Sequence, residues 1–270
     1  MRTLITKKIQ TPASKVAIAL LSGFLFGTAA GLIGVGGGEF RMPILLYALE
    51  LSTVTAIAVN LLVGLLTVVV SFVRRFQLGL INQHSLNVAI IMSFASIVGA
   101  YFGAFLTGKI PEKPLKKILA AFLIIVGLKI GLEPFIEIPF APAFTLGVVE
   151  ETILAALIGL AIGVIAGSLG VAGGEFRIPA LMYIFSLDVV AAGTTSLLVS
   201  IPTVATGFLK HKNMGHLDGK ATLIAVVMGL GSVLGAFIGA SFAGTVDKDI
   251  LKVLLGAILV LATVRMVTKP

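Results

Sequence analysis

Two short segments of this chain place a glutamate and an arginine behind a run of glycines, inside sequence that is otherwise apolar. They are GVGGGEFRMP at residues 34–43 and GVAGGEFRIP at residues 170–179. A charge at the centre of a membrane helix costs roughly 2.5–3.5 kcal/mol on insertion scales, so such charges usually mark a functional site. The glutamate and the arginine of the first segment both recur in the second at one shared offset. We therefore interpret the two segments as parts of one site.

The two arginines, Arg41 and Arg177, have the chemistry to bind a small anion. A guanidinium group matches a carboxylate, a sulfonate or another oxyanion through two parallel hydrogen bonds. Each arginine falls in the first turns of a predicted short helix, whose free N–H groups and dipole also favour an anion. The preceding glycines allow the backbone to unwind and a ligand to approach the main chain. These glycines are Gly36, Gly37 and Gly38 in the first segment and Gly173 and Gly174 in the second.

The glutamates, Glu39 and Glu175, admit two interpretations. They hold the arginines in place as ion-pair partners, or they titrate and couple anion movement to protons. We favour ion pairing for at least one of them, because an unpaired buried carboxylate is costly. Asn60 and Ser196 occupy matching positions in the two halves, and each either reaches the same cavity or forms an interhelical hydrogen bond. A tight helix crossing in which the charges only satisfy each other is the alternative to a binding site.

The elements that carry these residues are predicted to be membrane helices. Of the 270 residues, 58% are hydrophobic and 12% are charged, whereas a soluble domain is about 25% charged. Apolar helices are predicted at about 16–33, 54–73, 86–107, 115–132, 152–165, 189–209, 221–243 and 250–267, with short pieces at about 40–49 and 178–185. Residues 74–84 are predicted to form a polar loop. The three histidines, His84, His211 and His216, are all predicted to lie in loops.

The order of these elements repeats at the offset that relates the two segments, which aligns Thr67 with Thr203 and Gly99 with Gly235. We therefore predict an all-α integral membrane fold of two inverted repeats, with about five helical segments each and helices broken at the Gly-rich hinges. The first repeat covers residues 1–134 and the second covers 150–270, with an extracytoplasmic linker at 135–149. Lysines and arginines in the loops place both termini in the cytoplasm.

Small residues spaced four apart predict close packing between helices. They are Gly23, Gly27, Gly31, Gly99, Gly103, Gly159, Gly163, Gly167, Gly235 and Gly239. Ser52 and Thr53 are predicted to cap the helix that starts near Val54.

Composition and motifs argue against several classes of protein. The chain has no cysteine, so disulfides, thiol chemistry and Cys-based metal sites are excluded. We expect no metal site and no cofactor. The net charge of +8 falls in short loops, where positive charge sets membrane orientation, so we do not expect nucleic-acid binding. HExxH and GxSxG motifs are absent from the sequence, so we expect no catalytic residues and no enzyme activity.

The segments GLIGVGGGEFRMPILLY and GSLGVAGGEFRIPALMY resemble the paired signature of the TauE/SafE family, the sulfite exporter-like membrane anion permeases. The resemblance covers nearly the whole chain. It implies export or exchange of small sulfur-containing anions, such as sulfite, sulfoacetate or other sulfonates, across the cytoplasmic membrane. The Glu-Phe-Arg after the glycines is not expected in every member, which widens the range of substrates.

We expect a multi-pass protein of the cell membrane that acts as a secondary transporter or exporter of a small sulfur-containing oxyanion by alternating access. The alternatives are a passive anion channel and a transporter of another small anion, such as a carboxylate or thiosulfate. The expected partners are the anion, the lipid bilayer and, if transport is coupled, protons. A homodimer is compatible with the sequence.

Overall fold

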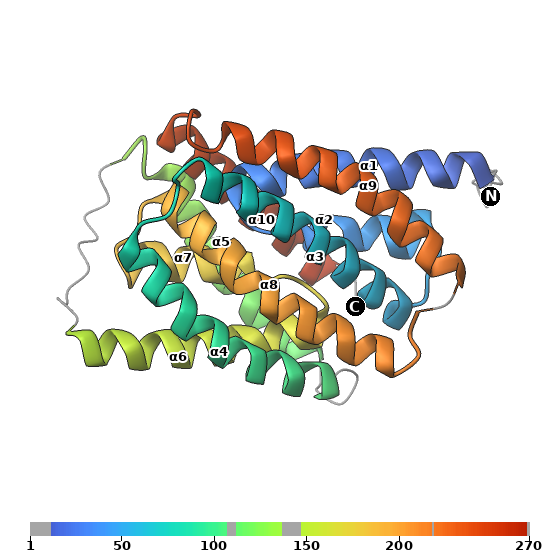
Figure 1. The fold of residues 1–270 in the computed structure, drawn as a ribbon, viewed down its shortest axis with the longest axis horizontal. Coiled ribbons are helices and arrows are strands. Elements are labelled where there is room, and N and C mark those ends of the chain that lie inside the picture. Colours follow the sequence, from blue (N-terminus) through green and yellow to red (C-terminus); the bar gives the residue numbers. More distant parts are fainter. Residues whose placement is uncertain (1–11, 107–111, 137–146, 218, 269–270) are drawn as a thin grey trace, which may run out of the picture.

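The computed structural model describes residues 12–106, 112–136, 147–217 and 219–268, and the regular structure within these ranges is helical (Figure 1). The first half contains α1 (Pro12–Ile33), α2 (Gly38–Pro43), the π-helix η1 (Ile44–Ala48), α3 (Thr53–Gln77), α4 (Gln83–Leu106) and α5 (Glu112–Leu132). The second half contains α6 (Val148–Leu169), α7 (Gly174–Tyr183), α8 (Val189–Asn213), α9 (Gly219–Phe242) and α10 (Lys248–Thr268). Most of the predicted linker at 135–149 lies outside the described residues.

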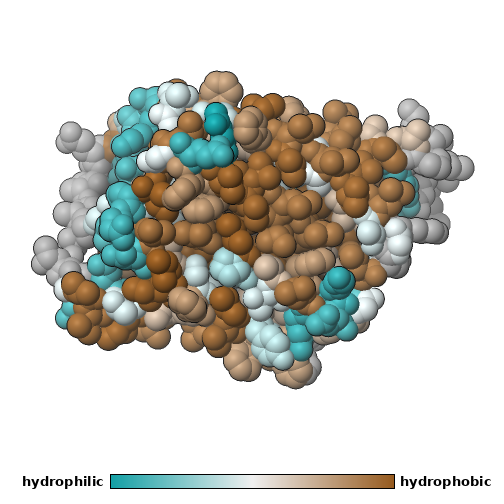
Figure 2. Space-filling view, in the orientation of Figure 1, coloured by the Kyte–Doolittle hydropathy of each residue, from teal (hydrophilic) through white to brown (hydrophobic). Residues whose placement is uncertain are grey.

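Six helices of the described chain are long and apolar enough to cross a membrane, namely α1, α3, α4, α6, α8 and α9. The surface in Figure 2 is hydrophobic across its middle, with hydrophilic side chains gathered towards the left end and the lower right. Large apolar side chains such as Leu21, Phe94 and Leu261 are more than 60% exposed. An exposed apolar surface of this extent is typical of contact with lipid. The prediction of an all-α integral membrane protein is confirmed.

The same local backbone conformations recur in the two halves. α1 ends before Gly34, which has a φ of 98°, and α6 ends at Gly170, which has a φ of 70°. A residue in this left-handed backbone conformation can end a helix, and glycine adopts the conformation without steric strain. The turns after the short helices contain Glu50 (φ 57°) and Ser186 (φ 54°), which are equivalent positions of the two repeats.

Side-chain caps start the two helices that lie at the centre of the fold. Ser52 Oγ accepts a hydrogen bond from the backbone N–H of Thr55 at 3.3 Å, which confirms the predicted cap of α3. Asp188 Oδ1 accepts from the N–H groups of Val190 and Ala191 at the start of α8. These bonds satisfy N–H groups that have no partner within their own helix. Each half therefore begins a long helix within a few residues of the end of its short one.

Glycines bring two pairs of helices into backbone contact, as predicted. α1 packs on α9 and α4 packs on α6. A Cβ atom on Gly235 of α9 would clash with the carbonyl oxygen of Phe24 in α1, and one on Gly103 of α4 would clash with that of Val164 in α6. Each pair joins a helix of one half to a helix of the other. The two halves are thus interlocked rather than separate domains.

Corresponding helices of the two halves run in opposite directions in Figure 1. α1 runs from right to left, whereas α6 runs from left to right. α3 and α8 contact each other at the centre, and α5 contacts α10. A two-fold axis in the membrane plane would produce this arrangement.

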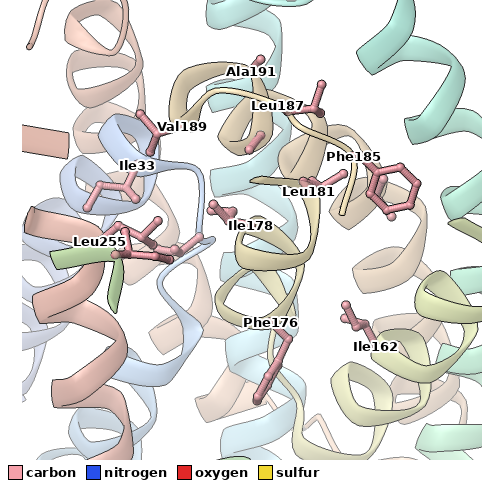
Figure 3. Close-up of a cluster of buried hydrophobic side chains, with 14 of the residues drawn as sticks. Ile33, Ile162, Phe176, Ile178, Leu181, Phe185, Leu187, Val189, Ala191 and Leu255 are labelled. Carbon is pink, nitrogen blue, oxygen red and sulfur yellow. The ribbon is translucent and has the colours of Figure 1, made fainter. Parts of the chain in front are cut away.

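The core around α7 is apolar and holds this short helix in place. Phe176, Ile178 and Leu181 of α7 are buried in one hydrophobic cluster with Ile33 from the end of α1 and Leu255 of α10 (Figure 3). The half-helix is therefore fixed by side chains from both halves of the chain.

Three sequence-based boundaries were wrong. α3 continues to Gln77, so Arg74 and Arg75 belong to a helix and not to the predicted polar loop. His84 lies in the first turn of α4, and His211 is buried within α8. Arg75 can be buried because it finds oxygen acceptors inside the protein, which offset the loss of hydration. His216 does lie in a loop, as predicted.

Candidate functional site

The two glycine-rich hinges meet at the centre of the molecule. A Cβ atom on Gly36 would lie 2.5 Å from the Cβ of Ala172, and one on Gly174 would lie 2.5 Å from the carbonyl oxygen of Val35. Neither position has room for a side chain. The five glycines predicted to form the site are all buried. Three of them, Gly36, Gly37 and Gly173, have positive φ values of 90°, 71° and 76°.

Arg41 of α2 is fully buried, and each nitrogen of its guanidinium group has a hydrogen-bond partner. Nε donates to Asn60 Oδ1 at 3.1 Å, Nη1 to Thr67 Oγ1 at 3.4 Å and Nη2 to the carbonyl of Gly36 at 2.9 Å. Gly64 leaves space for this extended side chain, since a Cβ atom there would lie 3.3 Å from Nη2. Three of the five N–H groups of the guanidinium are therefore bonded to the protein itself, at least one on each nitrogen.

Arg177 of α7 is equally buried, but only one of its nitrogens has partners. Nη1 donates to Ser200 Oγ at 2.7 Å, to the carbonyl of Ser196 at 3.1 Å and to the carbonyl of Ala172 at 3.4 Å. Nε and Nη2 have no hydrogen-bond partner among the residues that the structure describes. Buried polar groups without a partner are rare in native proteins and call for an explanation.

Asn60 and Ser196 occupy corresponding places beside the two arginines. Asn60 Nδ2 donates to the carbonyl of Gly38 in its own hinge at 3.1 Å and to that of Gly170 in the other hinge at 2.8 Å. Ser196 Oγ has no partner within the described part of the chain. Asn60 thus ties the hinges together, whereas the shorter Ser196 leaves its hydroxyl free.

Glu39 and Glu175 bring the carboxyl groups of the two halves together. Glu175 is 2% exposed, and its carboxyl group lies close enough to that of Glu39 for the two to interact. Each glutamate acts on the arginine of its own half through space, but the hydrogen bonds of Arg41 and Arg177 run to neutral oxygens. The ion pairing that we favoured from the sequence stays a prediction.

The sequence analysis missed Arg75, which lies next to the hinges. This fully buried side chain donates to the carbonyls of Gly31 at 3.0 Å and Leu32 at 2.7 Å, at the end of α1. It also donates to the carbonyl of Val190 at 3.2 Å and to Thr194 Oγ1 at 3.1 Å in α8. Arg75 therefore joins three helices on one side of the hinge crossing.

The offset between the repeats aligns Arg75 with His211, which is also buried. His211 Nδ1 lies 3.0 Å from His216 Nδ1. The alignment of a basic residue with a histidine in the repeated sequence was the signal that could have identified both positions. Across the described chain, groups of three or more His, Asp or Glu side chains that could hold a metal ion are absent.

Broken helices that meet between two interlocked halves of a membrane protein occur in many membrane transporters. The family model described as "Sulfite exporter TauE/SafE" matches residues 1–130 and 151–270, and the chain belongs to this family. It is a multi-pass membrane transport protein.

The relatives with curated names are described as membrane transporters. "Probable membrane transporter protein YdhB" of Bacillus subtilis (strain 168) is 27% identical over 237 residues, which cover 87% of this chain and 93% of the relative. "Probable membrane transporter protein YunE" of the same organism is 24% identical over 268 residues, covering 90% and 94%. "Probable membrane transporter protein ORF9" of Sinorhizobium sp is 26% identical over 258 residues, covering 94% and 93%. The chain matches no solved structure.

Proposed function

We propose that this chain is a secondary transporter that moves a small sulfur-containing oxyanion across the cell membrane by alternating access. The charge balance where the hinges cross is the observation that carries this proposal. Arg41 and Arg177 are both buried and donate only to neutral oxygens. Arg75, a third fully buried arginine, lies next to the hinges, so three guanidinium groups stand near the two neighbouring carboxyl groups of Glu39 and Glu175. The crossing therefore favours an anion.

The sulfur chemistry of the substrate is supported by the family and by the geometry of the donors. The family is described as sulfite exporters. Sulfite, sulfoacetate and other sulfonates present several oxygens that a guanidinium fork can bind. The helix that carries Arg177, α7, begins at Gly174 and adds the positive end of its dipole to the site.

Alternating access would follow from inverted repeats at residues 1–134 and 150–270, with the linker at 135–149 outside the cell and both termini in the cytoplasm. The opposite directions of α1 and α6 and the exchange of helix partners between the halves support this arrangement. Rocking of one half against the other would then open the site to each side in turn.

The contact between the hinges favours a transporter over a passive channel. A channel needs a continuous water-filled path, whereas the backbones at Gly36 and Gly174 lie directly against the opposite hinge. The carboxyl pair formed by Glu39 and Glu175 offers a site for a transported proton. We therefore propose proton coupling through this pair.

A thermal-shift screen of the purified protein tests the proposed function. The anions are sulfite, thiosulfate, sulfoacetate, sulfate and simple carboxylates, each at the same ionic strength. A ligand present at 100 times its Kd stabilises the folded state by about 2.7 kcal/mol, so a true substrate raises the Tm measurably. We expect the largest shift from a sulfur oxyanion, and uptake of that anion into proteoliposomes that contain the protein. A Tm that is unchanged by every anion would contradict the proposal.

A further inference from the structure

We infer that the two buried arginines have different tasks. Arg177 binds the anion through Nε and Nη2, together with Ser196 Oγ, whereas Arg41 is a positioning residue that fixes the hinge crossing. This inference rests on the proposed function and defines the substrate-contacting half of the site.

The free donors of Arg177 form a matched pair. Nε–H and Nη2–H lie on the same edge of the planar guanidinium group, so they point in parallel and fit two oxygens of one oxyanion. Both are fully buried and have no partner among the described residues. Nη1, on the other edge, is held by Ser200 Oγ at 2.7 Å and by the carbonyl of Ser196 at 3.1 Å. Ser200 thus fixes the orientation of the guanidinium group and leaves its Nε–H and Nη2–H without a partner in the protein.

Arg41 cannot present the same fork without breaking its present contacts. Asn60 Oδ1 occupies Nε at 3.1 Å and the carbonyl of Gly36 occupies Nη2 at 2.9 Å. Asn60 also holds the carbonyl of Gly170 in the opposite hinge at 2.8 Å. An anion at Arg41 would compete with bonds that join the two hinges.

Two differences between the repeats explain the asymmetry. Ser196 stands in place of Asn60, so no amide oxygen reaches Nε of Arg177, and the Ser196 hydroxyl remains as a third donor to an anion. Ser200 stands in place of Gly64, so Nη1 of Arg177 donates to Ser200 Oγ, whereas Nη1 of Arg41 donates to Thr67.

The free edge of Arg177 defines the class of ligand by its shape. Nε–H and Nη2–H are parallel donors without a partner among the described residues, so they fit an oxyanion with two oxygens on one edge, such as an alkyl sulfonate or hydrogen sulfite.

Calorimetric titration of the purified protein with methanesulfonate tests this inference. Arg177→Lys keeps the charge but removes the fork, so it should raise the Kd for methanesulfonate by about tenfold or more. Ser196→Asn should have a similar effect, because its amide oxygen would occupy Nε as Asn60 does in the first half.

Arg41→Lys is the matched control. We expect it to lower the Tm, to leave the Kd of the folded protein within about threefold of the wild type and to slow uptake into proteoliposomes at saturating anion. Ser196→Ala is a smaller change, which should raise the Kd for methanesulfonate without a loss of stability. It replaces Arg177→Lys as the test variant if Arg177→Lys does not fold. Equal losses of affinity in Arg41→Lys and Arg177→Lys, or an unchanged Kd in both Ser196 variants, would overturn the inference. A wild-type protein that binds no anion would instead overturn the proposed function.

Discussion

Replacing Arg75 by methionine should destabilise the protein strongly. The substitution keeps an unbranched side chain of similar length but removes four hydrogen bonds to oxygens of α1 and α8. The carbonyls of Gly31 and Leu32 belong to the last turn of α1 and have no partner within that helix. A buried oxygen left without a donor costs about 1–3 kcal/mol, partly offset because the buried charge is also lost. We expect a net loss of roughly 3 kcal/mol.

Thermal unfolding in detergent measures this effect, with Arg74→Met as the control. For a chain of this size, a loss of about 3 kcal/mol corresponds to a Tm lower by roughly 6–12 °C. Arg74 donates a single hydrogen bond to Ser241 Oγ at 2.8 Å and lies over the ring of Phe237, so its loss should lower the Tm much less. If the two variants unfolded at the same temperature, Arg75 would not be the link between α1, α3 and α8 that its contacts describe.

Three further predictions concern helix packing, capping and coupling. Gly235→Ala should cost about 1–3 kcal/mol by forcing α9 away from α1, whereas Gly219→Ala, in open space, should be neutral in the same unfolding assay. Ser52→Ala should lower the free energy of unfolding by about 1 kcal/mol through loss of the α3 cap, and an unchanged value would assign the cap no role. Glu39→Gln and Glu175→Gln should each alter the pH profile of anion uptake, because each removes one of two neighbouring buried carboxyl groups; identical profiles would leave both carboxyl groups as structural partners.

The sequence predicts the helices and their close pairing well, because both depend on local patterns. Long apolar stretches specify the membrane helices, and glycines four apart specify where backbones touch, as at Gly103 and Gly235. The constant offset between the repeated segments identifies the two hinges as equivalents. A site made from both hinges follows from that equivalence, and the structure places the hinges in contact.

The partners of the buried charges could not be predicted from local patterns. Arg75 follows an apolar stretch, where arginine commonly marks a membrane boundary, and only the carbonyls at the end of α1 explain why it points inward. The free edge of Arg177 depends on which side chains α8 presents to α7, namely Ser196 and Ser200. Such contacts between helices require the three-dimensional packing, although the exchange of Asn60 for Ser196 is visible in the aligned repeats.

Anomalous scattering from a crystal of the protein soaked with selenite, a selenium analogue of sulfite, would test the central claim most directly. The account predicts a selenium peak where the hinges cross, with its oxygens in hydrogen-bonding contact with Nε and Nη2 of Arg177. The peak should be absent from crystals of Arg177→Lys. Selenium bound only at the membrane surface, in a protein that still transports the anion, would contradict the account.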